Sequence, residues 1–286
     1  MGPLSSPDDV ADGLRTDGYL SDRGLAVAIF LAASMGRPLL LEGEPGVGKT
    51  EVAKALARLT GAELVRLQCY EGIDASQALY EWDYARQLLR ARVQDSTDVT
   101  GLYAEEFLLE RPLLKALRAG ERAVLLIDEL DRADDEFEAF LLEILSDFQV
   151  TIPELGTITA ETPPLVIVTS NRTRELHDAL KRRCLYHWID YPSLERETEI
   201  IRVRVPGVED ALAHSVAGAV ARLREMELVK PPGPAEAIDW TQALQLIGAK
   251  EVTADAARDT IGSAVKNRDD LQRVERELAE LVAPRD

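Results

Sequence analysis

The sequence predicts an α/β domain with a parallel five-stranded sheet between helices, followed by a smaller all-helical domain. Short apolar runs, typical of buried strands, alternate with helical patterns up to about residue 192. One of these runs leads directly into a G-x-x-x-x-G-K-[ST] motif that opens a helix. After Tyr191-Pro192-Ser193 the strand signals stop, and only helical patterns remain. These observations predict both the fold class and its division into two parts.

Five apolar runs predict the strands of the sheet: Leu39–Leu41, Leu64–Leu67, Ala123–Ile127, Leu165–Val168 and Tyr186–Ile189. The clearest helix follows Asp135, a candidate N-cap, because apolar residues then recur every three or four positions. Residues 1–15 are polar and rich in Pro and Asp, which predicts a disordered leader. The expected domains are therefore 16–192 and 193–286, with Ser193 capping the first helix of the second domain.

The motif between the first strand and its helix is a phosphate-binding P-loop. Its residues are Gly43, Glu44, Pro45, Gly46, Val47, Gly48, Lys49 and Thr50. Glycines allow backbone N–H groups to surround a phosphate, and the following helix adds partial positive charge at its N-terminus. Lys49 can reach the β- and γ-phosphates, and the Thr50 hydroxyl can ligate Mg²⁺. The sequence therefore predicts ATP and Mg²⁺ as cofactors.

A second acidic motif comes about eighty residues later, where the apolar run Ala123–Ile127 ends in Asp128 and Glu129. Adjacent residues of a strand point to opposite faces, so the two acids can perform different tasks. Asp128 can hold Mg²⁺ directly or through its waters, and Glu129 can polarise the attacking water. The competing interpretation is a charged strand end that faces solvent.

Two further polar features lie between the fourth predicted strand and the fifth. The run Leu165–Val168 leads to Asn171, which either fixes the attacking water or is an amide favoured by turn geometry. The basic segment Lys181-Arg182-Arg183 precedes the last strand. A charge run is usually a solvated face, but an arginine here can also stabilise the transition state of phosphoryl transfer.

Composition narrows the classes of partner. The 286 residues carry a formal net charge of −18 with a pI of about 4.7, which argues against a nucleic-acid partner. Cys69 and Cys184 lie far apart and form no CxxC pair, so we expect buried, reduced thiols in a cytoplasmic protein. No apolar run reaches the length of a membrane span, and no signal peptide is visible.

Five features in this order resemble an AAA+ ATPase. They are the P-loop, the Asp-Glu pair, the strand followed by Asn171, the segment Leu180-Lys181-Arg182-Arg183-Cys184 and a helical lid. The stretch from Asp128 to Pro153 is similar to the MoxR branch of that family. The segments Gly18–Asp22 and Gln68–Asp74 resemble the CoxD-like members in particular. The resemblance covers nearly the whole chain from about residue 15.

The resemblance implies a homo-oligomer, a hexameric ring with ATP at the subunit interfaces. Residues 43–50, Asp128, Glu129 and Asn171 would form one half of each site, and Arg183, rather than Arg182, would reach the γ-phosphate of the neighbouring subunit. Tyr19 and Leu20 would lie near adenine. Insertions are expected at about 70–92 and, as a hairpin, at about 150–164. One departure is clear: the stretch Pro234–Trp240 lacks the arginine that the family places at the sensor 2 position.

The first insertion contains the aromatic residues Tyr80, Trp82 and Tyr84. They either pack in the core, as aromatic residues ordinarily do, or present a tip to a partner or pore.

The function that the resemblance implies is ATP-driven remodelling together with a protein carrying a von Willebrand A domain. The client would be a metalloenzyme under maturation, such as molybdenum carbon monoxide dehydrogenase or a related hydroxylase. A nucleic-acid motor or clamp-loader ATPase is the alternative, although the acidic balance disfavours it. A small-molecule kinase is a third possibility, and such an enzyme would not need Glu129 to act on water.

Overall fold

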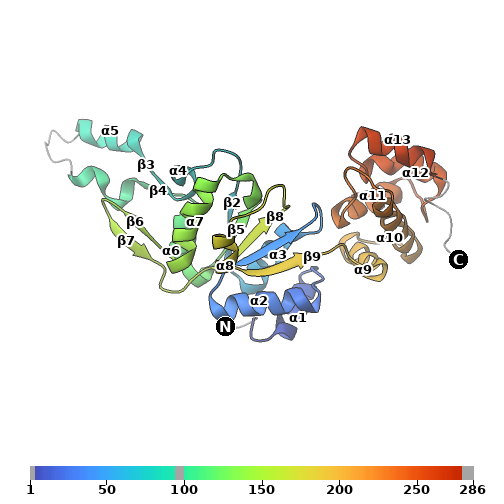
Figure 1. The fold of residues 1–286 in the computed structure, drawn as a ribbon, viewed down its shortest axis with the longest axis horizontal. Coiled ribbons are helices and arrows are strands. Elements are labelled where there is room, and N and C mark those ends of the chain that lie inside the picture. The colour runs from blue at the N-terminus through green and yellow to red at the C-terminus, as the bar shows by residue number, and fades with distance from the viewer. Residues whose placement is uncertain (1–3, 94–99, 279–286) are drawn as a thin grey trace. The chain divides into compact units, whose positions relative to one another are not determined.

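The computed structural model describes residues 4–93 and 100–278, and these separate into two compact units (Figure 1). The first unit contains the sheet and its helices up to Trp188. The second contains the chain from Ile189 onward together with the short segments 18–20 and 44–48. The change of unit therefore falls at the end of the last strand, a few residues before Ser193.

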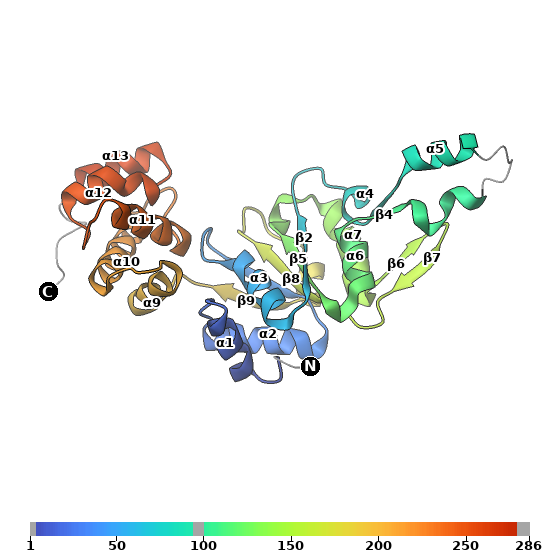
Figure 2. The same cartoon turned by 180° about the vertical axis from the view of Figure 1, so that it is seen from behind.

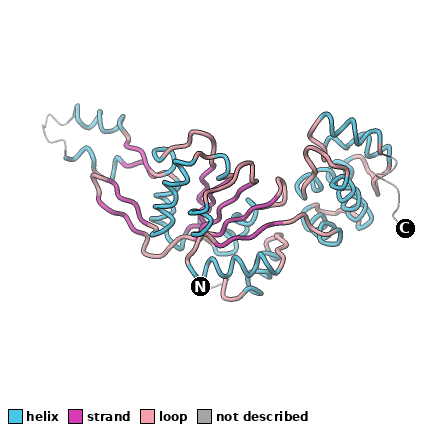
Figure 3. Tube along the Cα trace, in the orientation of Figure 1, coloured by secondary structure: helices cyan, strands magenta, loops and turns pink. Residues whose placement is uncertain are grey.

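The central sheet has five strands in the order β2-β5-β8-β1-β9. They are β1 (Leu39–Gly43), β2 (Glu63–Gln68), β5 (Ala123–Asp128), β8 (Leu165–Ser170) and β9 (Leu185–Ile189). The pairs β2–β5, β5–β8 and β8–β1 are parallel. The predicted fold class is confirmed, and Figure 3 shows these strands in magenta among helices. Strand β8 lies between β5 and β1, so the acidic motif and the P-loop strand flank the strand that leads to Asn171.

Both faces of this sheet are covered because its strands are apolar on both sides. Leu40, Leu125 and Val168 belong to one buried cluster with α6 (Pro112–Ala119) and α7 (Asp135–Asp147). The alternate residues of the same strands, which are equally buried, face the other side. Helices α2 (Arg23–Met35) and α3 (Lys49–Thr60) contact the sheet, and Figure 2 shows α3 and α7 on opposite sides of β2 and β5. This arrangement is the helix–sheet–helix sandwich expected of a parallel sheet.

The predicted disordered leader is wrong for residues 7–15. Helix α1 (Pro7–Thr16) begins at the N-cap Ser6, whose hydroxyl accepts the Asp9 N–H at 3.1 Å. Val10 and Leu14 are fully buried, so this polar helix contributes an apolar stripe to the core. The polar composition concealed that stripe. Residues 1–3 lie outside the described part of the chain.

Two smaller sheets correspond to the expected insertions. In the first insertion, β3 (Tyr80–Trp82) pairs antiparallel with β4 (Leu108–Glu110), so the insertion extends well beyond residue 92. It also contains α4 (Ala75–Ala78) and α5 (Tyr84–Val93). The second is a hairpin of β6 (Gln149–Ile152) and β7 (Gly156–Thr159). The hairpin thus starts within a residue of its predicted position.

The three aromatic residues of the first insertion divide between the two interpretations. Trp82 is buried, with its ring edge-to-face against Tyr80 at 6.3 Å and Tyr103 at 5.4 Å. Tyr80 packs against the main buried cluster. Tyr84 is 61% exposed at the start of α5. Core packing therefore accounts for two of the three rings.

Residues 190–278 of the second unit contain helices and no strand, as Figure 3 shows. The helices are α9 (Leu194–Arg204), α10 (Asp210–Glu225), α11 (Pro234–Leu246), α12 (Ala254–Thr260) and α13 (Arg268–Arg276). Ser193 caps α9 as predicted, since its hydroxyl accepts the Arg196 N–H at 3.3 Å. The core of this unit forms around Trp240, which is fully buried and donates its indole N–H to Thr260 at 2.8 Å.

None of the described helices is both long enough and apolar enough to cross a membrane.

Candidate nucleotide site

The P-loop connects the end of β1 to the start of α3, as the motif predicts. Gly46 and Gly48 have φ values of 80° and 96°, in the left-handed region that side chains rarely adopt. The turn therefore needs glycine at both positions. Lys49 is 7% exposed, and its ammonium donates to the Gly43 carbonyl at 2.7 Å. The cation is thus already held at the base of the loop.

Asp128 is the centre of a buried polar cluster. It is 2% exposed, and its Oδ1 accepts hydrogen bonds from the hydroxyls of Thr50 at 3.0 Å and Thr169 at 2.6 Å. Its Oδ2 accepts from the Nε and Nη2 of Arg66 at 3.0 and 2.6 Å. Both oxygens are therefore satisfied, as a buried carboxylate requires.

The pair of Thr50 and Asp128 fits Mg²⁺. The described residues contain no group of three His, Cys, Asp or Glu side chains that could hold a metal on their own. Mg²⁺ at phosphate sites usually takes one or two protein ligands and completes its shell with phosphate and water. A hydroxyl and a carboxylate oxygen 3.0 Å apart at the start of α3 meet that requirement. Bound there, Mg²⁺ would neutralise phosphate charge that develops during hydrolysis.

Glu129 does not continue the strand, so the expected strand alternation is not what separates the two acids. Strand β5 ends at Asp128, and Glu129 has φ 56° and ψ 49° in the left-handed region. Its backbone N–H donates to the Thr169 hydroxyl at 2.9 Å. Its Oε2 accepts from the Gln68 amide at 3.0 Å and pairs with Arg132 at 3.0 Å. A turn of the backbone, fixed by Thr169, thus separates the acids.

Asn171 directly follows the central strand β8. Within the described ranges its amide makes no hydrogen bond, so it is available to a ligand. The loop around it is anchored by Thr173, whose N–H and hydroxyl bind Asp131 Oδ2 at 2.9 and 2.6 Å. Arg172 has φ 55°, so a turn does follow this amide. The geometry is compatible with either predicted role of Asn171.

The basic residues around α8 (Asp178–Arg183) fall into two groups. Arg174 pairs with the buried Glu138, and Lys181 pairs with Glu175 at 3.2 Å. The side chains of Arg182 and Arg183 are exposed and have no hydrogen bond or ion pair within residues 4–93 and 100–278. The basic segment is therefore not a continuous stripe of free charge.

The backbone that carries Arg182 and Arg183 is fixed by Arg37. The Arg37 Nε donates to the Arg183 carbonyl at 3.1 Å, and its Nη2 donates to the carbonyls of Arg182 at 2.8 Å and Cys184 at 3.3 Å. These contacts satisfy carbonyls that the end of a helix leaves open. Both arginine side chains thus project from a held helix end.

Tyr19 and Leu20 belong to the second unit, together with residues 44–48. A Cβ added to Gly48 would lie 3.7 Å from Cε2 of Tyr19, so this ring is beside the P-loop. The Leu20 carbonyl accepts a hydrogen bond from Arg196. The structure thus brings Tyr19 to the loop that would hold the phosphates.

The start of α11, where the sensor 2 arginine is missing, is capped locally by Glu236, which accepts the Gly233 N–H at 2.9 Å. Arg224 of the same unit is not a free cation. Its guanidinium makes two hydrogen bonds to Glu197, at 2.7 and 2.6 Å, and a third to the Pro232 carbonyl at 2.8 Å. Burial raises the pKa of Glu197, although the Arg224 contacts act in the opposite direction.

Five side chains of this region were not predicted as site residues: Arg37, Arg66, Gln68, Arg132 and Thr169. A signal existed for two of them. Arg66 and Gln68 are polar residues two positions apart on an otherwise apolar strand, so they share one face. The register that pairs Gln68 with Asp128 was not visible in the sequence.

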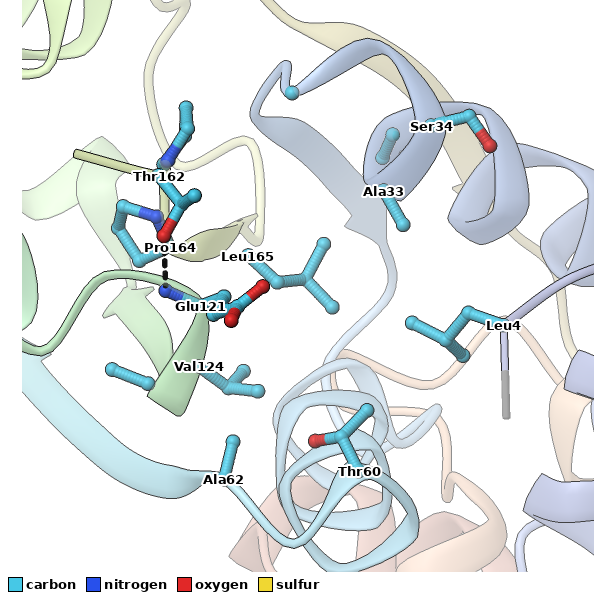
Figure 4. Close-up of a pocket in the computed structure, with 14 residues that line it drawn as sticks. Leu4, Ala33, Ser34, Thr60, Ala62, Glu121, Val124, Thr162, Pro164 and Leu165 are labelled. Atoms are coloured by element: carbon cyan, nitrogen blue, oxygen red, sulfur yellow. Dashed lines mark hydrogen bonds between the residues drawn. The ribbon is translucent and has the colours of Figure 1, made fainter. Parts of the chain in front are cut away.

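One cavity of the first unit lies away from these residues (Figure 4). The cavity has a volume of about 370 Å³ and is lined by Thr60, Val124 and Leu165 among others. Val124 and Leu165 lie at the amino-terminal ends of β5 and β8. Ligands of open α/β sheets bind at the carboxyl ends of the strands, where Thr50 and Asp128 meet. This cavity is therefore not the nucleotide site.

Comparison with known proteins agrees with this geometry. Residues 38–184 match the AAA domain family, dynein-related subfamily. Protein NorQ of Paracoccus denitrificans is 26% identical over 63% of this chain and 62% of its own length. The gas vesicle ATPase GvpN1 of Halobacterium salinarum is 24% identical over 85% of this chain and 73% of its own length.

YehL of Escherichia coli is 29% identical over 65% of this chain but only half of its own length. Among solved structures, the Thermotoga maritima RuvB Holliday junction branch migration motor is similar with a TM-score of 0.50 and 19% identity. That match covers 97% of this chain and 80% of RuvB, and at this identity it supports the fold alone.

Proposed function

The chain belongs to the dynein-related subfamily of AAA domains and is a MoxR-like AAA+ ATPase, and from this premise we propose that it is an ATP-driven remodelling factor that works as a ring. In this proposal Lys49 and residues 43–50 bind the phosphates, Thr50 and Asp128 hold Mg²⁺, and Glu129 polarises the attacking water. Asn171 positions that water. Tyr19 and Leu20 contact adenine.

The observation that carries the ring proposal is the pair of exposed arginine side chains at the fixed end of α8. Arg37 fixes the carbonyls of Arg182 and Arg183, while both guanidinium groups remain exposed and unpaired within the described ranges. A preorganised donor costs little to align with transition-state charge. An arginine supplied by a neighbouring subunit can accelerate phosphoryl transfer on the order of a thousandfold or more. Arg183 is therefore proposed as the residue that completes the neighbour's site.

The partner and client follow from the resemblance to CoxD-like members of the MoxR branch. We propose that the ring acts with a von Willebrand A domain protein on a metalloenzyme under maturation, such as a molybdenum-containing carbon monoxide dehydrogenase or related hydroxylase. The proposed assembly is a hexamer that binds Mg²⁺ together with ATP. The proposed location of the protein is the cytoplasm.

A nucleic-acid motor is disfavoured by charge. The chain carries a net charge of −18, and Arg174 and Lys181 of its basic segment are paired with acids.

The ring proposal is tested by mixing two inactive variants. Glu129→Gln subunits lack the group that activates water, and Arg183→Ala subunits lack the group supplied to the neighbour. Each variant alone should bind ATP and hydrolyse it slowly. In a mixed ring, some interfaces pair an intact Glu129 with an intact Arg183, so part of the turnover should return.

Arg182→Ala is the matched control, since it removes the adjacent exposed guanidinium and should leave most of the activity. The ring proposal fails if mixtures that co-assemble, as shown by native mass measurement, recover no turnover. The proposed partner is tested separately, by measuring whether a co-expressed von Willebrand A domain protein stimulates turnover when DNA does not.

A further inference from the structure

Arg66 contacts the carboxylate that would help to hold the metal. It projects from β2, the strand next to β5, and its Nε and Nη2 both donate to Asp128 Oδ2, at 3.0 and 2.6 Å. The same Nη2 also donates to the Gln68 side-chain oxygen. The guanidinium is thus held by two partners, although half of its side chain is exposed.

The two oxygens of Asp128 have different neighbours. Oδ1 accepts from Thr50, the P-loop residue that fits a metal ligand, and Oδ2 accepts from Arg66. The guanidinium therefore does not contact Oδ1, the carboxylate oxygen that meets Thr50. It does, however, place a full positive charge next to the buried anion that should attract a divalent cation.

We propose that Arg66 is a positioning residue that shares Asp128 with Mg²⁺ and thereby sets the Mg²⁺ concentration at which the nucleotide site takes up its metal. Without a metal, Arg66 neutralises Asp128 and avoids the cost of a buried unpaired charge. When Mg²⁺ binds, its attraction to Asp128 is offset by repulsion from the guanidinium. The inference rests on Mg²⁺-dependent nucleotide binding and on no feature of the ring, partner or client.

The test measures metal binding at equilibrium rather than turnover. A fluorescent ADP derivative is titrated into the full-length protein in EDTA and then across a series of Mg²⁺ concentrations. In Arg66→Met, the Mg²⁺ concentration that gives the half-maximal change in nucleotide affinity should fall on the order of tenfold, because a screened repulsion of this size is removed. The affinity for the nucleotide in EDTA should stay within about twofold of the wild-type value, since Arg66 contacts Asp128 and Gln68 but not the P-loop.

Two further variants separate charge from structure. Arg66→Lys keeps the charge and should stay near the wild-type midpoint. Arg58→Met removes an arginine with the same half-exposed side chain, paired with Asp17 at 2.6 Å, and should leave the midpoint unchanged. Arg66→Gln is a second charge-removing variant, to be used with a thermal melt that reports folding.

An unchanged or higher midpoint in folded Arg66→Met would overturn the proposal. The same conclusion follows if Arg66→Lys shifts as far as Arg66→Met, or if both Arg66→Met and Arg66→Gln fail to fold, since Arg66 would then have a structural role. If the wild type binds nucleotide without any response to Mg²⁺, the metal assignment itself is wrong. That outcome is distinct from a failure of the ring, which the mixing experiment reports.

Discussion

The ion pair between Glu197 and Arg224 should control the stability of the helical unit. The two side chains are 1% and 10% exposed and share two hydrogen bonds of 2.6 and 2.7 Å. Arg224 also lies 4.3 Å from the centroid of the Tyr191 ring. Glu197→Leu leaves this buried guanidinium without its counter-charge, and loss of one member of such a pair costs about 3–5 kcal/mol.

Replacing both members should cost much less. Glu197→Leu combined with Arg224→Met removes both buried charges, and apolar replacement of a buried pair is often close to neutral. The lost hydrogen bond to the Pro232 carbonyl adds about 1 kcal/mol. We therefore expect the double variant to be more stable than either single variant.

Urea unfolding measures this effect if the signal comes from the helical unit. The chain has three tryptophans, and a background of Trp82→Phe and Trp188→Phe leaves Trp240 as the reporter. Arg202→Met is the matched control, since Arg202 pairs with Asp210 at 2.8 Å on the exposed surface of the same unit and should cost at most about 1 kcal/mol. A loss below about 1 kcal/mol in Glu197→Leu, equal to the control, would refute the reasoning.

The pair of Glu197 and Arg224 also predicts how the free energy of unfolding depends on pH. Burial raises the pKa of Glu197 in the folded protein, so the folded state binds this proton more readily than the unfolded state does. The contribution of Glu197 to the free energy of unfolding is therefore largest below its unfolded pKa and is lost as pH rises through the folded pKa. Arg224→Met removes contacts that lower this pKa and should extend the loss to higher pH. A pH profile equal to that of the wild type would contradict this assignment.

Three further predictions concern single side chains. Lys49→Ala should abolish tight ATP binding because the ammonium neutralises the phosphates, and wild-type affinity by calorimetry in a folded variant would contradict the P-loop role. Glu129→Gln should still bind ATP but hydrolyse it roughly a hundredfold more slowly or worse, whereas near-normal turnover would make Glu129 a mere strand-end charge. Burial raises the pKa of Cys69 and of Cys184 to about 12, so both thiols should resist a thiol reagent at pH 8 until the protein unfolds. Rapid labelling of the native protein would show that they are not buried.

The strands of the sheet could be predicted because three are uninterrupted apolar runs, such as Leu39–Leu41, and the other two are interrupted only by Arg66 or His187. Helix α1 could not, because its two buried residues, Val10 and Leu14, lie among small and acidic residues whose composition suggests a leader. The N-cap of α7 is Asp134 rather than Asp135, a difference of one residue between two equally suitable caps. Local composition thus predicts elements well where one residue type dominates.

In the candidate site, the contacts within motifs could be predicted, but the contacts between neighbouring strands could not. The motifs predicted that Thr50 and Asp128 would meet, and their oxygens are 3.0 Å apart. Thr169 was missed because its role depends on the register of β8 against β5, which brings its hydroxyl to Asp128. Arg66 depends in the same way on the pairing of β2 with β5. Contacts between neighbouring strands are set by register, and a single sequence does not contain that information in readable form.

In the proposed ring, each subunit binds nucleotide but needs its neighbour's Arg183 to hydrolyse it. The most direct measurement is turnover per subunit across a dilution series, with the assembly state followed by mass measurement in the same samples. We expect turnover to fall by on the order of a thousandfold as rings dissociate, while nucleotide binding persists in the separated subunits. Full turnover by a monomer at high dilution would contradict the claim.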